Sequence, residues 1–258
     1  MSFIATLLLG FSSAIGVALT PGAIIRSHHF DDGTLGAFVN PWDAGIDFPQ
    51  DPTGKGHGRV ARILYEPGRA THHASQDRGF GYQAGSDRIR YARTIWVRGD
   101  VYLPNAGSKR KANHNRKLID FAGSGPTGIH TRLTLHRRDM MLYVSTVDWM
   151  GGSLRETVAE STGIRLADDT WHTIELRMTT NSADRVRDGV VEIYMNGATT
   201  PSYSRRKGLG WITQRYRGGS FFNWFGIGSQ LTIDAGDPVY REYRYWDNVR
   251  FSTRRLAP

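Results

Sequence analysis

Short segments in which apolar and polar residues alternate recur along the chain, with turn residues between them. The clearest is segment 129–136, in which Thr131, Leu133 and Leu135 alternate with charged and polar residues. Because successive side chains of a strand point to opposite faces, this alternation predicts a half-buried strand. Similar patterns predict strands over residues 89–103, 118–121, 141–147, 171–178, 190–195, 221–227 and 240–252.

The connecting segments favour an all-β architecture. Residues 40–59 are rich in glycine, proline and aspartate, which predicts a long surface loop. Residues 30–34 predict a strand that runs into a turn, and Asn196-Gly197 predicts a tight turn after segment 190–195. Since no segment shows a long apolar period of 3.6 residues, the expected fold is two stacked antiparallel sheets with little helix.

The N-terminus differs in character from the rest of the chain. Residues 3–19 form an apolar run weakened by small residues, and Gly16 to Ala18 has the small-x-small pattern of a signal-peptide cleavage site. We therefore expect residues 1–23 to be a signal peptide or a retained apolar segment, and residues 24–258 to form a single domain. Cleavage near Ala18 would give a secreted, extracellular protein with no membrane contact.

The composition excludes some kinds of chemistry and favours some classes of partner. The 258 residues include no cysteine, which excludes disulfides, thiol nucleophiles and thiolate metal sites. The formal net charge of +9 favours a polyanionic partner, and nucleic acid, anionic membrane and acidic polysaccharide all qualify. Nucleic-acid binding ranks lower than polysaccharide binding because the basic residues are scattered among strands and no recognition helix is visible. The sequence does not indicate an oligomeric state.

Candidate chemistry lies on the polar sides of the predicted strands. A strand face that contacts only water usually carries small hydroxyls, lysine and glutamate, whereas these faces carry imidazole, guanidinium and phenol groups. We expect the strands to place these groups together in one concave patch. The candidate residues are His130, Arg132, His136, Tyr143, Tyr243 and Tyr245.

Such a patch suits an acidic sugar. Arginine pairs bidentately with a carboxylate, and histidine and tyrosine can transfer protons. β-Elimination of a uronide needs a cation that neutralises the carboxylate, a base for the C5 proton and an acid for the leaving oxygen. A solvated or locally paired role remains the alternative for each of these residues taken alone.

Several motifs resemble known families. Segments 169–176 and 188–197 are similar to a pattern widespread in concanavalin-A-like jelly rolls, in which a tryptophan-led strand is followed by a Gly-to-Gly hairpin strand. Segments 225–229 and 246–249 are similar to the closing strands of the same superfamily. Segment 116–123, RKLIDFAG, resembles the lysine strand and glycine turn of polysaccharide lyase family fourteen, which includes alginate and glucuronan lyases. The strands around His130-Thr131-Arg132 and Leu142-Tyr143-Val144-Ser145 resemble that family's arginine strand and its following tyrosine strand.

The lyase resemblance implies roles for three residues. Lys117 and Arg132 would neutralise the substrate carboxylate and bind substrate, and Tyr143 would act as acid or base. Ser145 stands where the family has a second tyrosine, so His130 or His136 would supply the other proton transfer. Tyr243 and Tyr245 are further candidates for substrate contacts.

Other functions fit the sequence less well. Retaining glycoside hydrolysis is disfavoured because Glu175 and Glu192 sit on separate predicted strands. No cofactor is expected, although Asp31, Asp32 and Asp247 could hold a structural calcium ion; turn capping is the alternative role of the first two. A lyase acting on an acidic polysaccharide is the leading hypothesis. The alternatives are a non-catalytic carbohydrate-binding module and a structural appendage protein of a virion or cell surface.

Overall fold

The computed structural model describes residues 25–40, 45–65, 74–77, 79–83, 88–104, 114–122, 129–136, 139–150, 153–183, 186–205, 224–233 and 241–255. It describes the backbone alone at residues 74–77, 88, 90, 114–115, 122, 129–130, 136, 147–150, 153–158 and 229–233. The predicted signal segment and its cleavage site therefore lie outside the described residues.

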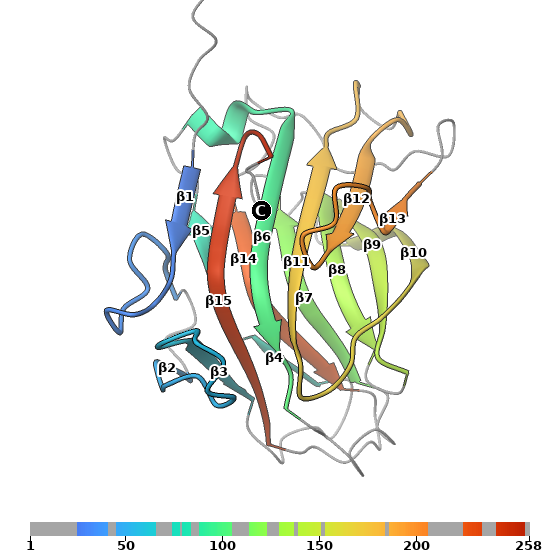
Figure 1. The fold of residues 1–258 in the computed structure, drawn as a ribbon. Coiled ribbons are helices and arrows are strands. Elements are labelled where there is room, and N and C mark those ends of the chain that lie inside the picture. Colours follow the sequence, from blue (N-terminus) through green and yellow to red (C-terminus); the bar gives the residue numbers. More distant parts are fainter. Residues whose placement is uncertain are drawn as a thin grey trace, which may run out of the picture.

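The strands form two antiparallel sheets stacked face to face (Figure 1), which confirms the predicted all-β class. The eight-stranded sheet has the order β13-β12-β11-β6-β15-β3-β2, with β1 paired to β15. Its strands are β1 (Ile25–His28), β2 (Ile46–Asp47), β3 (Ala61–Tyr65), β6 (Thr94–Tyr102), β11 (Trp171–Thr179), β12 (Val190–Met195), β13 (Tyr203–Ser204) and β15 (Glu242–Ser252).

The seven-stranded sheet lies behind the first in Figure 1 and has the order β10-β9-β8-β7-β14-β4, with β5 paired to β14. Its strands are β4 (Ala74–Asp77), β5 (Phe80–Gln83), β7 (His114–Ala122), β8 (Ile129–His136), β9 (Met141–Met150), β10 (Ser153–Arg165) and β14 (Trp224–Ile233). Among the described residues the helical element is one 3-10 turn, η1 (Arg88–Tyr91), and no helix is long and apolar enough to cross a membrane.

Several predicted elements have different bounds. The first strand is β1 (Ile25–His28), and the segment expected as a strand at residues 30–34 is instead the turn that follows it. The long loop expected at residues 40–59 contains the short strand β2 and a single bridge between Gln50 and Arg59.

The pattern of apolar and polar residues does not predict the edge strand β10. Its sequence SLRETVAESTGIR carries few apolar residues. At the end of its sheet it pairs on one side only, with β9, so its sequence gives little of the apolar alternation on which strand prediction depends.

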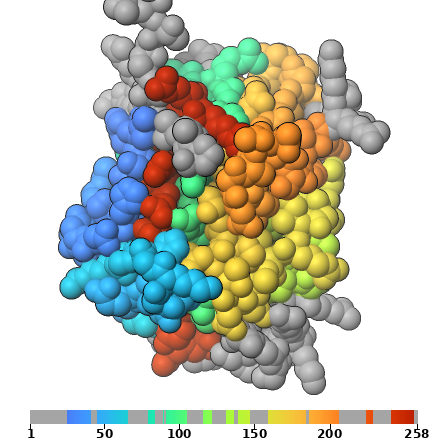
Figure 2. All heavy atoms as spheres, viewed as in Figure 1, coloured from blue at the N-terminus to red at the C-terminus, as the bar shows by residue number. Residues whose placement is uncertain are grey.

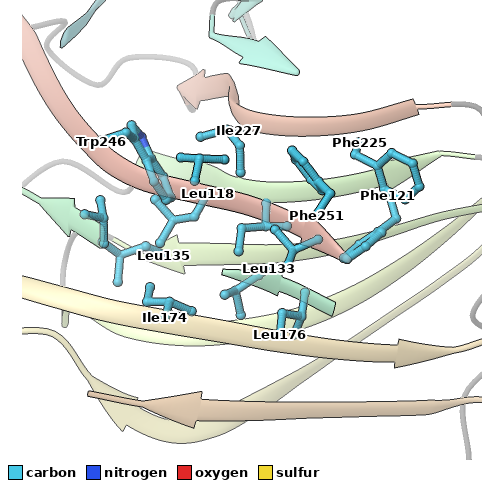
Figure 3. Packing of buried hydrophobic residues seen from close by; sticks show 14 of the residues in the cluster. Leu118, Phe121, Leu133, Leu135, Ile174, Leu176, Phe225, Ile227, Trp246 and Phe251 are labelled. Atoms are coloured by element: carbon cyan, nitrogen blue, oxygen red, sulfur yellow. The ribbon is translucent and has the colours of Figure 1, made fainter. Parts of the chain in front are cut away.

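The core fills the space between the sheets. Strand β8 contributes Leu133 and Leu135, and strand β15 of the other sheet contributes Trp246 and Phe251, all fully buried (Figure 3). On β11, Ile174 and other alternate residues are buried, as the sequence predicted. Each long strand therefore directs one set of alternate side chains inward and the other set to an outer face.

A buried ion cluster joins the sheets at one end of the core. Arg116 on β7 of one sheet pairs with Glu242 on β15 of the other, and its side chain is 1% exposed. Glu242 also accepts from Arg244 Nε at 3.2 Å, and the Arg244 guanidinium lies 3.9 Å from the ring centroid of Tyr65. One carboxylate thus serves two guanidinium groups that have little access to water.

Replacing this carboxylate is expected to destabilise the fold strongly. Glu242→Gln leaves two buried cations without their shared anion, a change that costs about 3–5 kcal/mol in comparable buried pairs. Urea unfolding followed by circular dichroism measures the loss. The control is Asp47→Asn, which breaks the exposed Arg62–Asp47 pair and should cost less than about 1 kcal/mol. Equal losses in the two variants would contradict the role given to the cluster.

The loop that contains β2 packs on the outer face of the eight-stranded sheet. Trp171 on β11 donates its indole N–H to Asp51 Oδ1 at 3.1 Å, and the His57 ring stacks on the same indole at 4.1 Å. His57 Nδ1 lies 2.9 Å from Asp247 Oδ2 on β15. Figure 2 shows the cyan atoms of this loop against the yellow atoms near residue 170.

Asp51 gives this loop a pH-dependent attachment. Burial by itself would raise the pKa of Asp51, but hydrogen bonds from Thr53, Trp171 and His57 outweigh it and lower the pKa to about 2. Because the folded-state pKa lies below the unfolded value, this carboxylate stabilises the fold above the unfolded pKa. That contribution is lost as the pH falls through the folded pKa.

Asp51→Asn is therefore expected to lower the melting temperature at neutral pH. Its deficit relative to the wild type should shrink as the pH falls from about 4 to about 2, because the wild-type carboxylate is protonated over that range first in the unfolded state and then in the folded state. Thermal unfolding at a series of pH values tests this. A deficit that stays constant down to pH 2 would show that ionisation of Asp51 does not contribute.

Candidate functional site

The candidate site lies on the outer face of the seven-stranded sheet. Thr131, Leu133 and Leu135 of β8 are fully buried toward the core, so the alternation of the strand places Arg132 and Thr134 on the opposite face. On β9 the buried residues Leu142 and Val144 likewise leave Tyr143 on that outer face.

The strand register brings the polar side chains into two neighbouring rows. In the first row Lys117 on β7 is opposite Thr134 on β8, which is in turn opposite Tyr143 on β9. In the second row Asp120 is opposite Arg132, and Arg132 is opposite Ser145. Directly opposite residues have Cβ atoms about 4.5–5.5 Å apart, so each row is a set of neighbours.

The charges on this face are close together and little exposed. Lys117 is 8% exposed and Asp120 is 6% exposed. Arg132 Nε lies 3.3 Å from Asp120 Oδ2, which forms an ion pair on the face itself. The face therefore combines two cations, one carboxylate and the phenol of Tyr143.

The structure brings together three of the predicted residues and fixes the strand positions of two more. Lys117, Arg132 and Tyr143 share one face on three successive strands. Positions 130 and 136 have the same alternation on β8 as Arg132. The side chains of His130 and His136 lie outside the described residues.

The expectation that Tyr243 and Tyr245 would add to the same patch is wrong. Both belong to β15, which lies in the eight-stranded sheet, so the core separates them from Arg132 and Tyr143. Tyr245 is buried beside Tyr102 on the outer face of its own sheet. The order of strands within a sheet depends on distant pairings, which the local pattern of β15 does not encode.

Sequence reasoning missed Asp120. The signal was present, because Asp120 is the single charged residue between the apolar Ile119 and Phe121 of its strand. Alternation alone would have placed it on the face opposite Phe121, beside the predicted arginine.

The predicted calcium ligands have hydrogen-bonding roles. Asp32 Oδ1 accepts from the backbone N–H of Thr34 at 2.9 Å, which is the turn-capping role considered from the sequence. Asp31 Oδ1 accepts from the backbone N–H of Arg59 at 3.1 Å, and Asp247 contacts His57. Within the described part of the chain, no group of three or more acidic or histidine side chains is placed to hold a metal ion. Calcium binding by these residues remains a prediction.

Comparison with protein-family models and with curated proteins gives no match. Solved structures do share the fold. The PL-14 alginate lyase from Aplysia kurodai superposes with a TM-score of 0.56 at 16% identity, covering 86% of this chain and 90% of that one. The endo-beta-1,4-glucuronan lyase from the fungus Trichoderma reesei gives 0.55 at 14% identity, covering 86% and 93%.

A third similar structure is the cellulose induced protein Cip1, with a TM-score of 0.56 at 15% identity, covering 90% of this chain and 99% of that one. At such identities the likeness establishes the fold. The chain has the jelly-roll fold of these proteins, and the resemblance predicted from its motifs is confirmed at the level of the fold.

Proposed function

We propose that the chain is a secreted protein that cleaves an acidic, uronate-containing polysaccharide by β-elimination on the outer face of the seven-stranded sheet. The observation that carries the proposal is the register that sets Lys117, Arg132 and Tyr143 on one face of three successive strands. The similarity in fold to an alginate lyase and a glucuronan lyase supports it.

Each residue would have a defined part in the reaction. Lys117 and Arg132 would bind the uronate carboxylate, which makes the proton on C5 more acidic. A base removes that proton, its electron pair forms the double bond between C4 and C5, and the bond from C4 to the glycosidic oxygen breaks. The departing oxygen then takes a proton from an acid. Tyr143 would serve as base or acid, and His130 or His136 would supply the other transfer.

A second function is favoured by the ion pair on this face. Asp120 already balances part of the charge of Arg132, with Nε and Oδ2 3.3 Å apart, and this weakens the arginine as a neutraliser of a substrate carboxylate. A face on which Arg132 is already paired with a carboxylate suits a non-catalytic carbohydrate-binding module better than a lyase. The two functions differ in whether the chain releases product.

The panel that separates them consists of alginate, glucuronan, pectate and heparinoids. Ultraviolet absorbance from a new unsaturated uronide identifies a lyase and its substrate. Saturable binding without product supports the binding module. If none of the glycans binds or reacts, both proposals fail and the structural appendage hypothesis leads.

Secretion is tested separately by intact-mass analysis of the exported protein. Loss of the residues up to about Ala18 would agree with the proposal. Export with Met1 still attached would contradict signal cleavage and favour the appendage hypothesis.

The site residues are tested by three single substitutions. If the chain is a lyase, Tyr143→Phe should lower kcat about 10²–10⁴-fold while the Kd for the glycan changes little, because only proton transfer is lost. Arg132→Ala should weaken both binding and turnover, since it would hold the carboxylate in the ground state and the transition state. The matched control is Tyr245→Phe, which removes a phenol from the other sheet and should leave both constants unchanged. Equal losses in Tyr143→Phe and Tyr245→Phe would overturn the placement of the site.

Asp120→Asn tests the electrostatics of the same face. Removing this carboxylate should tighten the binding of an acidic oligosaccharide by about fivefold at low salt, because one unit charge at contact distance in water is worth about 1 kcal/mol. Isothermal titration calorimetry measures the change. The control is Asp188→Asn in the loop between β11 and β12, which alters the net charge equally at a distant position. Tighter binding in both variants would indicate a general charge effect.

A further inference from the structure

A depression on the opposite side of the molecule has no part in the proposed reaction. It lies on the outer face of the eight-stranded sheet, over β6, β11 and β15, which are side by side in Figure 1. Its lining residues are Trp96, Arg98, Glu175, Arg250, Ser252 and Arg254. Three of these six are arginines, and one is acidic.

Two of the arginines are direct cross-strand partners. Arg98 on β6 is opposite Arg250 on β15 in the register of the sheet. Opposite residues have Cβ atoms about 5 Å apart, and like charges in this position destabilise a sheet. Arg254, just beyond the end of β15, adds a third positive charge to the same depression.

The one acidic residue is already engaged. Glu175 is opposite Arg98 on the other side, but its Oε2 lies 2.7 Å from a guanidinium nitrogen of Arg255. Arg255 is held in place by the carbonyl oxygens of Ala198 and Thr199 and by the ring of Tyr194, 4.0 Å from its guanidinium carbon. Glu175 therefore neutralises Arg255, and the three lining arginines keep an excess of positive charge.

The guanidinium groups of these arginines have no ion-pair partner in the part of the chain that the structure describes. The Nε atom of Arg98 is buried and has no hydrogen-bond partner. Among the described residues, no carboxylate forms an ion pair with Arg98, Arg250 or Arg254, whereas the neighbouring Arg177 on the same face pairs with Glu192 at 2.9 Å. A buried guanidinium donor without an acceptor is costly, and an oxyanion in the depression would relieve both this cost and the repulsion.

We propose that this depression is an oxyanion-binding site of the sulfate or phosphate class, distinct from the face that carries Tyr143. A tetrahedral anion offers four oxygens to three guanidinium groups, whereas a carboxylate has two oxygens and is saturated by fewer donors. The anion would be a free ion or a sulfate ester on a glycan. Because the core separates the two faces, a test of this site is independent of a test of the proposed lyase reaction.

The direct test is isothermal titration calorimetry of the full chain with sodium sulfate and sodium phosphate, with ionic strength held constant by sodium chloride. Saturable binding is expected in the wild type. Arg250→Gln and Arg98→Gln should each weaken it by about tenfold or more, because each removes charge-assisted hydrogen bonds. The matched control is Arg177→Gln, which removes the same charge from the same sheet face and should leave binding unchanged. Failure of the free anions and also of a sulfated oligosaccharide to bind, or equal weakening in all three variants, would overturn the proposal.

Thermal stability gives a second readout that a merely structural role would not produce. Near tenfold saturation, sulfate should raise the melting temperature of the wild type and of Arg177→Gln by about 3 °C relative to chloride, and should raise that of Arg250→Gln much less. Without sulfate, Arg250→Gln should melt no lower than the wild type because a like-charge pair has been removed. A large loss of stability in Arg250→Gln together with a full sulfate effect would mean that the arginine only packs, and would overturn the proposal.

The source of the anion is resolved by a sulfated oligosaccharide and its desulfated form. Binding of the sulfated form that is lost in Arg250→Gln, without binding of the free ion, supports a glycan-borne sulfate. Binding of the free ion as well supports a site for the anion itself. Equal binding of the desulfated form would show that sugar contacts dominate and would overturn the oxyanion assignment.

Discussion

Each long strand of this chain must bury alternate side chains between two sheets, and the remaining features of the fold depend on that constraint. The inward set is almost entirely apolar, as in Leu133, Leu135, Trp246 and Phe251. At one end of the core the constraint is met differently, because Arg116 and Arg244 enter the space between the sheets and need Glu242 as their common anion. The outward set is free of the packing requirement, and this freedom allows the chain to place chemistry on either outer face.

The two outer faces have different chemical character. The face with Lys117, Arg132 and Tyr143 combines cations, a carboxylate and a phenol in two adjacent rows, and the proposed β-elimination depends on these groups. The face with Arg98 and Arg250 has an excess of guanidinium groups and suits anion binding without chemistry. Part of the positive net charge of the sequence thus lies on these two outer faces, which are separated by the core.

The local pattern of apolar and polar residues predicted the features that depend on neighbours in the sequence, such as strand faces and turns. The alternation at Ile129–His136 fixed which side of β8 carries Arg132, and Asn196-Gly197 is indeed the turn after β12, with positive φ at both residues. The local pattern gave wrong predictions where the position of a strand depends on pairing with segments that are distant in the sequence. The alternation of β15 predicted that Tyr243 and Tyr245 belong to the candidate patch. The residues near them in the sequence do not indicate that β15 pairs with β1, β3 and β6. The pairing of Arg132 with Asp120 likewise follows from the register between β7 and β8.

The position of β15 in its sheet has a consequence for how the chain is made. This strand spans Glu242–Ser252, near the end of the sequence, yet it lies between β6 on one side and β3 and β1 on the other. The seven-stranded sheet likewise receives β14, which joins β7 to β4 and β5, only after β7, β8, β9 and β10. The native pairing of the eight-stranded sheet can therefore be completed only after synthesis of the chain is nearly finished. Because these pairings join segments that are far apart in the sequence, we expect both sheets to form late and slowly.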